Sequence, residues 1–259
     1  MYTFRAMVTA ISLAALLIFV VAPMVHADSD TPILSFKDAT SLLGPGVVGE
    51  PLPDSPIPDA RTLLPTKLGK WTYKIVSGKH AGSTRTNVLK AAADPDEPGL
   101  WQRHNPGNRV FSIAASEQAL TVQSLGVFDH NLLIEYLSGE LLVRKGMKPG
   151  DQITHKTDVR AVKLNHPSHE RSHGYLDITV TYMGRRKVTT PAGQFDTYLI
   201  RRDIKSDVSP VKQTDTIYAF YADNVGIVAQ VSHLDVDAAF VYRQNTRTGL
   251  VLQSLPTSN

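Results

Sequence analysis

Short runs of β-branched and aromatic residues recur along the chain from Trp71 onward, and they limit the possible folds more than any other feature. The runs include WTYKIVS (71–77), RVFSIAA (109–115), QITHKTDVRAVKL (152–164), DTIYAFYA (215–222) and VGIVAQVSH (225–233). Strands favour Val, Ile, Thr, Tyr and Phe, and turn residues separate these runs. The sequence therefore predicts an all-β fold, a large curved antiparallel sheet of about 10–13 strands that forms a half-barrel or a closed barrel.

Two of the runs indicate which strands have one buried face and which have two. In GYLDITVTYMG (174–184), alternate positions are apolar: Leu176, Ile178, Val180 and Tyr182. This period of two is typical of an antiparallel sheet with one wetter face. QFDTYLIRRDI (194–204) carries apolar residues on both faces, so we expect it to be more central.

Glycine, proline and asparagine mark the expected hairpin turns. We expect turns at 148–151, 183–185, 191–193 and 223–226, and a hairpin loop at 77–84.

The N-terminus has the pattern of an export signal. Arg5 precedes an apolar run over residues 6–25, and small residues follow at the end of VHA (25–27). We therefore expect a signal peptide at 1–27, cleaved before Asp28, with an uncleaved membrane anchor as the alternative. Cleavage would leave no transmembrane segment and a periplasmic or secreted bacterial protein. The chain has no cysteine, so stability in that compartment must come from a packed core.

Residues 28–66 differ in composition from the β domain predicted at 67–259. They are rich in proline and glycine, as in LLGPGVVGEPLPDSPIPDARTLLPT (42–66), with no sustained period of 2 or 3.6. We expect a linker or an arm along the surface. Its apolar residues could also plug the concave face of the sheet: Leu42, Leu43, Val47 and Val48.

The charge of the chain argues against nucleic acid as a partner. The formal net charge is +3, with the basic residues spread along the sequence. We interpret the basic runs at 185–187 and 201–202 as solvated strand faces rather than a contact with anionic lipid.

Two segments resemble uncharacterised bacterial envelope proteins. They are VTTPAGQFDTYLIRRDI (188–204) and TIYAFYADNVGIVAQVSHLD (216–235), and the matching residues are Pro191, Gly193, Phe195, Tyr221, Ala222, Val225, Gly226 and Val228. The resemblance implies a periplasmic β-sheet protein of unknown function, similar in style to the lipoprotein carriers whose curved sheets shelter acyl chains. It implies no catalytic residue.

Three histidines lie within HPSHERSH, residues 166–173. His166, His169 and His173 have the spacing i, i+3 and i+7, which on a helix would offer three imidazoles to zinc and leave a fourth position open. The spacing matches no zinc signature, and the run separates two strand patterns, so a solvated hairpin loop is the competing interpretation. A pH-sensing role is a further hypothesis.

Two functions from different classes remain. The first is a non-enzymatic periplasmic binding or envelope-maintenance protein without a cofactor, which shelters a lipid or other hydrophobic small molecule or docks to an envelope protein. Its candidate ligand-binding residues, which could equally form an ordinary core, are Trp71, Tyr73, Phe111, Tyr136, Tyr218 and Phe220. The second is a metal-binding protein or metal-dependent hydrolase that uses zinc at the three histidines.

Overall fold

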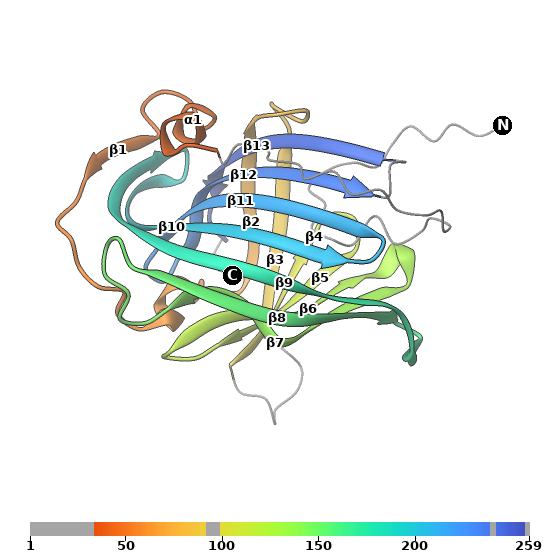
Figure 1. Ribbon diagram of the computed structural model, residues 1–259. Coiled ribbons are helices and arrows are strands. Elements are labelled where there is room, and N and C mark those ends of the chain that lie inside the picture. Colours follow the sequence, from red (N-terminus) through yellow and green to blue (C-terminus); the bar gives the residue numbers. More distant parts are fainter. Residues whose placement is uncertain (1–33, 92–98, 239–241, 257–259) are drawn as a thin grey trace.

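The chain folds into a closed antiparallel β-barrel in the computed structural model, which describes residues 34–91, 99–238 and 242–256 (Figure 1). The strands are β1 (Val48–Pro51), β2 (Gly69–Ser77), β3 (Thr84–Ala91), β4 (Leu100–Asn105), β5 (Arg109–Ala115), β6 (Ala119–Val127), β7 (Leu132–Arg144), β8 (Gln152–Lys163), β9 (His166–Thr190), β10 (Gly193–Val208), β11 (Val211–Ala222), β12 (Gly226–Ala238) and β13 (Tyr242–Ser254). Consecutive strands from β2 to β13 pair with each other, the β13–β2 pair closes these 12 strands into a ring, and β1 adds to β9. The all-β prediction is confirmed, and the closed barrel is the correct one of its two forms.

The hairpin connections alternate between the two ends of the barrel. The turns at 78–83, 106–108, 128–131, 164–165 and 209–210 lie at one end, and those at 116–118, 145–151, 191–192 and 223–225 lie at the other. The predicted turns at 148–151, 191–193 and 223–226 and the predicted loop at 77–84 are confirmed. The signal-peptide prediction falls on residues 1–27, outside the described residues.

The predicted turn at 183–185 is wrong, because β9 continues through it. Tyr198 pairs with Arg185 and Ile200 pairs with Tyr182, so two residues of β9 lie opposite one residue of β10 and form a bulge there. Gly184 has a φ of +93°, which a residue with a Cβ adopts only with strain. Glycine at this place therefore bends a 25-residue strand instead of ending it.

Alternation along the strands separates the inside of the barrel from the outside. Leu176, Ile178, Val180 and Tyr182 on β9 are all buried, as their period predicts. On β10, Leu199 and Ile200 are neighbours and both are buried, which confirms that this strand is covered on both faces.

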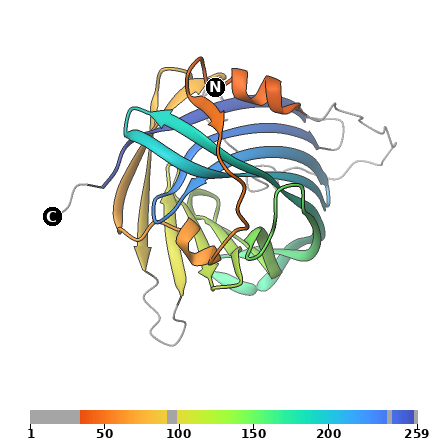
Figure 2. The same ribbon diagram turned by 90° about the vertical axis from the view of Figure 1, so that its left-hand side faces the viewer.

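The first part of the N-terminal arm, residues 34–51, covers the outer face of β10–β13 (Figure 2). It contains α1 (Phe36–Ser41), whose N-cap Ser35 accepts a hydrogen bond from the backbone N–H of Asp38. The Tyr218 hydroxyl donates to the Leu34 carbonyl at 2.8 Å, and its ring lies 6.0 Å from that of Phe36. Within the described residues, no helix is long and apolar enough to cross a bilayer.

Residues 57–65, which we call the plug, close the barrel end that carries the turns at 116–118, 145–151 and 223–225. The plug contains the short 3-10 helix η1 (Ala60–Leu63). Backbone hydrogen bonds join it to all three turns: Ile57 N–H to Met147 O at 2.9 Å, Ala60 N–H to Glu117 O at 3.0 Å, and Asn224 N–H to Thr62 O at 2.5 Å. Ile57 and Leu63 are buried there. The arm therefore does plug the barrel, but through 57–65 and not through residues 42–48, which contact the outer wall.

The outer cover makes Phe220 a core residue although it points away from the barrel interior. Its side chain is completely buried among residues of the arm and of β10–β13. We expect Phe220→Ala to lower the free energy of unfolding by about 3–5 kcal/mol, because a large cavity replaces the ring. Phe128→Ala is the matched control, since Phe128 is 56% exposed and should change stability by about 0.5 kcal/mol or less. Urea titration of the two variants measures both values, and equal losses would contradict the described packing.

Candidate functional site

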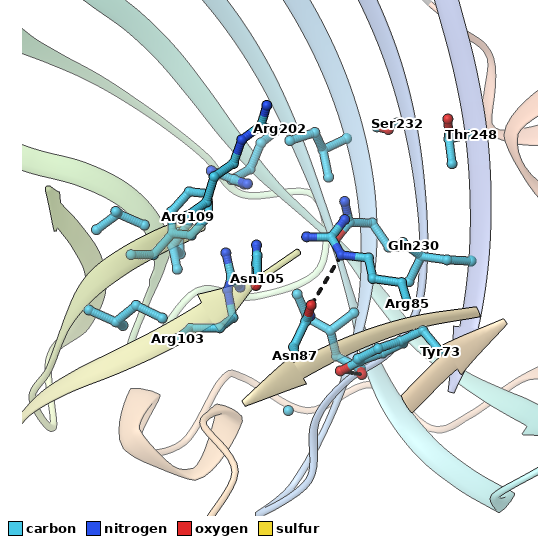
Figure 3. Close-up of a pocket in the computed structure, with 18 of the residues that line it drawn as sticks. Tyr73, Arg85, Asn87, Arg103, Asn105, Arg109, Arg202, Gln230, Ser232 and Thr248 are labelled. Carbon is cyan, nitrogen blue, oxygen red and sulfur yellow. Dashed lines mark hydrogen bonds between the residues drawn. The ribbon is translucent and has the colours of Figure 1, made fainter. Parts of the chain in front are cut away.

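The barrel encloses one cavity of about 430 Å³ that runs along its interior (Figure 3). Sites for small molecules typically have volumes of roughly 300–1,000 Å³. The cavity is lined by β2–β7 and β9–β13 and by the plug. It therefore has the size and position of a ligand site inside a barrel.

The cavity is apolar at the plugged end and carries most of its polar groups toward the opposite end, which we call the mouth, where Ile204 and Leu234 also line it. Toward the plug it is lined by Leu63, Leu64, Ile113, Leu120, Val122, Leu142, Ile217 and Ile227. Toward the mouth it is lined by Thr84, Arg85, Asn105, Arg109, Gln213, Ser232, Thr246 and Thr248. Ser83, Thr84 and Pro106, near the turns of the mouth, line the cavity and are exposed, so the cavity reaches the surface there.

Four arginines line the cavity, and all four are labelled in Figure 3. The guanidinium of Arg103 lies 4.6 Å from the ring centre of Phe111, and Arg85 Nε donates to Asn87 Oδ1 at 3.1 Å. Among the described residues, the ion pairs formed by arginines include neither Arg85 nor Arg103. Burial lowers the pKa of Arg85 to about 10 and also lowers that of Arg103, as expected for cations inside a protein wall. Arg109 and Arg202 complete the set.

Arg202 is the arginine that has a carboxylate partner. Its Nη1 donates to Glu140 Oε1 at 2.5 Å, and both side chains are largely buried. Burial is the largest single effect and acts to lower the pKa of Arg202, but the charge and hydrogen bond of Glu140 together with Tyr221 and Asp215 outweigh it, and the pKa is raised. The cavity lining thus has four guanidinium groups and two carboxyl groups, those of Glu140 and Asp215.

Asp215 lies on β11 and lines the cavity, two residues from Ile217, which pairs with Arg202 on β10. Burial raises its pKa to about 7, and the opposing effect of Arg202 only reduces the shift, while Glu140 and Asp203 add to it. The carboxyl group therefore holds its proton to a much higher pH than a free aspartate does. The cavity is strongly cationic.

The six aromatic residues predicted to bind a ligand divide between the two sides of the wall. Trp71, Tyr73, Phe111 and Tyr136 line the cavity. Tyr218 and Phe220 pack outside it, in the apolar cluster beneath the arm. On β11 the odd-numbered residues face inward, so the two even-numbered aromatic residues cannot line the same cavity.

The three histidines of HPSHERSH lie in an extended hairpin and not in a loop. β8 ends at Lys163 and β9 begins at His166, and His173 pairs with Arg160. The three side chains are exposed, and the His173 Nδ1 lies 3.0 Å from Glu170 Oε1. The part of the chain that the structure describes contains no group of three His, Asp or Glu residues able to hold a metal ion.

The sequence interpretation missed the charged interior. Arg202 was expected on a solvated strand face, yet it is 8% exposed and lines the cavity. Its neighbour Arg201 does lie outside, where it pairs with Asp203 at 2.9 Å. The alternation of side chains along the strand identifies Arg202 as an inward residue, because Ile200 and Ile204 share its face of the strand and are buried.

We expect replacement of His166, His169 and His173 together by alanine to leave the fold intact, because exposed positions cost about 0.5 kcal/mol or less each. Urea unfolding measures the stability, and native mass spectrometry with added zinc measures the metal. A stoichiometric zinc ion that is lost in the variant would contradict the exposed, separate positions of these side chains.

The raised pKa of Asp215 makes stability depend on pH. Folding raises this pKa from 3.8 to about 7, so the folded protein holds the proton more tightly than the unfolded chain and stability falls as pH rises between these values. Asp215→Asn removes this loss. We expect similar stabilities of variant and wild type near pH 4, and a variant more stable by roughly 1–4 kcal/mol near pH 8.

Urea unfolding across this pH range tests the effect of Asp215. Asp177→Asn is the control, since Asp177 is 45% exposed and lies 3.9 Å from Lys156, and it should keep the wild-type pH dependence. A parallel pH dependence for Asp215→Asn and wild type would contradict a buried, protonated Asp215.

Comparison with known proteins gives a family match over part of the chain. The DUF3108-like family model matches residues 143–233, from the end of β7 into β12. This match overlaps the segments at 188–204 and 216–235 and confirms the resemblance to uncharacterised proteins. Among the curated proteins, none matches the chain.

Three solved structures are also similar. One is from Bacteroides fragilis, described as an exported protein with a YmcC-like fold, with 14% identity over 76% of this chain and 99% of its own and a TM-score of 0.45. A protein described as a lipoprotein from Parabacteroides distasonis has 13% identity over 77% and 99%, with a TM-score of 0.38. The hypothetical lipoprotein YmcC of Escherichia coli has 12% identity over 76% and 95%, with a TM-score of 0.37.

Proposed function

We propose that this protein is a non-enzymatic binding protein of the bacterial cell envelope that holds a small anionic amphiphile inside its barrel. The anionic group of the ligand lies among the arginines of the cavity, and its apolar part extends toward the plug. The protein shelters this molecule from water.

The single observation that carries the proposal is the set of inward-facing arginines. Charged groups inside a protein are costly unless they are paired, and Arg85 and Arg103 belong to none of the ion pairs found among the described residues. Guanidinium groups bind carboxylates and phosphates through parallel hydrogen bonds. An anion in the cavity would therefore gain these bonds and relieve the repulsion between the cations.

The polarity gradient supports an amphiphile over a simple anion. Leucine, isoleucine and valine side chains line the half of the cavity near the plug, and Leu63 of the plug itself forms part of this lining. A small inorganic anion would leave that half without a partner. An acyl or alkyl chain would fill it, with a gain of about 0.8 kcal/mol for each buried CH₂ group.

The envelope setting is supported by the pattern of the N-terminus. The expected signal peptide at 1–27 directs the chain out of the cytoplasm. Lipids and their fragments are ligands that need shelter from water in that compartment. The zinc-dependent alternative has weaker support, because its three histidines are exposed and separate.

We expect Arg103→Gln to weaken the binding of decanoate by about tenfold or more, since a hydrogen bond to a charged group contributes roughly 1.5–3 kcal/mol. Isothermal titration calorimetry of the folded chain without its first 27 residues measures the affinity. Arg171→Gln removes the same charge from the exposed hairpin and should leave the affinity unchanged. Equal affinities of wild type and Arg103→Gln would contradict the proposed anion site, and so would the absence of any decanoate binding.

A further inference from the structure

The cationic cavity also contains buried hydrogen-bond acceptors, which a simple anion cannot use. Asp215 Oδ1 and Gln213 Oε1 are buried and have no hydrogen-bond partner among the described residues. Both side chains line the cavity, and both are more than nine-tenths buried, with 9% and 8% exposed. A buried acceptor without a donor is costly, so a ligand that fits this wall brings hydrogen-bond donors as well as a negative charge.

Hydroxyl and amide groups line the same cavity on the neighbouring strands β12 and β13. Ser232 on β12 pairs directly with Thr248 on β13, and both line the cavity with Gln230 (Figure 3). Hydroxyl and amide side chains can each donate and accept hydrogen bonds. This wall therefore offers donors and acceptors side by side, while the arginines of β3–β5 offer donors alone.

The charge of the cavity decides what kind of donor the ligand brings. An ammonium group would meet the nearby guanidinium of Arg202, which already has Glu140 as its partner. The positive charges of the cavity would repel any cationic ligand. An uncharged hydroxyl group has no such penalty, and it can donate to Asp215 or Gln213 while it accepts from Ser232, Thr248 or Arg202 Nε, an atom that is buried without a partner among the described residues.

We propose that the β11–β13 wall around Asp215 and Gln213 is a subsite for hydroxyl groups, and that the ligand is a hydroxylated anionic amphiphile, an acidic sugar joined to a short apolar chain. This inference rests on the proposed function, since it places the hydroxyl groups beside the anion site of the same cavity. The carboxylate of the sugar would contact the arginines, its hydroxyl groups would contact β11–β13, and its apolar chain would extend to the plug.

The test compares three probes that carry apolar chains of similar length and differ in the head group. Octyl glucuronide carries a carboxylate and hydroxyl groups, octyl glucoside carries hydroxyl groups alone, and decanoate carries a carboxylate alone. Titration calorimetry with the wild-type chain should give the tightest binding for octyl glucuronide, by about tenfold over each of the other two, which is the effect of one or two hydrogen bonds. Equal affinities for octyl glucuronide and decanoate would overturn the hydroxyl subsite and leave the proposed function standing.

Substitutions in the β11–β13 wall test whether these two acceptors bind the hydroxyl groups of the ligand. Asp215→Leu should lower the affinity for octyl glucuronide relative to that for decanoate by about tenfold, whereas Asp215→Asn, which keeps an acceptor oxygen, should lower this ratio less. Gln213→Leu gives a second, independent removal of an acceptor, and Asp177→Leu on the outer face is the matched control. Circular dichroism confirms that each variant is folded before titration.

The outcomes separate the two proposals. A loss of octyl glucuronide binding in Asp215→Leu and Gln213→Leu, with decanoate binding retained, supports the subsite. Equal loss of both probes, or loss of neither, overturns it. If neither octyl glucuronide nor decanoate binds the wild-type chain, the proposed function itself fails and the subsite fails with it.

Discussion

The hydrogen bonds between β13 and β2 are the constraint on which the rest of the structure depends. They join the first and the last strand of the ring, whose other pairs follow the chain order, remove its free edges and create an interior. Once the sheet is closed, the period of two assigns every residue to one side of the wall. This is why Arg201 and Arg202, neighbours in the sequence, have different partners: Arg201 pairs with Asp203 outside, and Arg202 pairs with Glu140 inside. The charged cavity therefore results from the closure of the sheet together with the alternation of side chains along each strand.

Closure leaves an open end and an apolar outer face, and the arm covers both. The outer face of β10–β13 carries Tyr218 and Phe220, which would be exposed without α1 and the residues around it. Two tyrosine hydroxyls hold the arm in place, because Tyr218 donates to Leu34 O at 2.8 Å and Tyr182 donates to Ser55 O at 2.9 Å. The arm is therefore part of the same folding unit as the barrel, and the aromatic residues of β11 stabilise its outer layer while inward residues of the same strand line the cavity.

The strand pattern could be predicted because burial on one face leaves a period of two in the sequence. The hairpin at 166–173 could not, since both of its faces are exposed and no apolar alternation marks it. The bulge at Gly184 has the same residue type as a turn, and only the pairing of β9 with β10 distinguishes them.

α1 did have a local signal, the Ser35 and Asp38 spacing of a helix N-cap. The inward position of Arg202 could have been predicted if the alternation along the strand had been applied to charged residues as well, because Arg202 shares its face with Ile200 and Ile204.

The cationic interior links the fold to the proposed ligand. The lowered pKa values of Arg85 and Arg103 show that the folded chain holds these charges at a cost, and the tertiary packing of the barrel and the plug must offset it. An anion bound among them would reverse this effect, since a ligand that binds only the folded state raises its stability. The residues that weaken the empty barrel are thus the ones that would give the loaded barrel its affinity. A cavity lined by leucine in place of these arginines would be expected to make a more stable protein, but it would have no means to distinguish an anionic amphiphile from a neutral one.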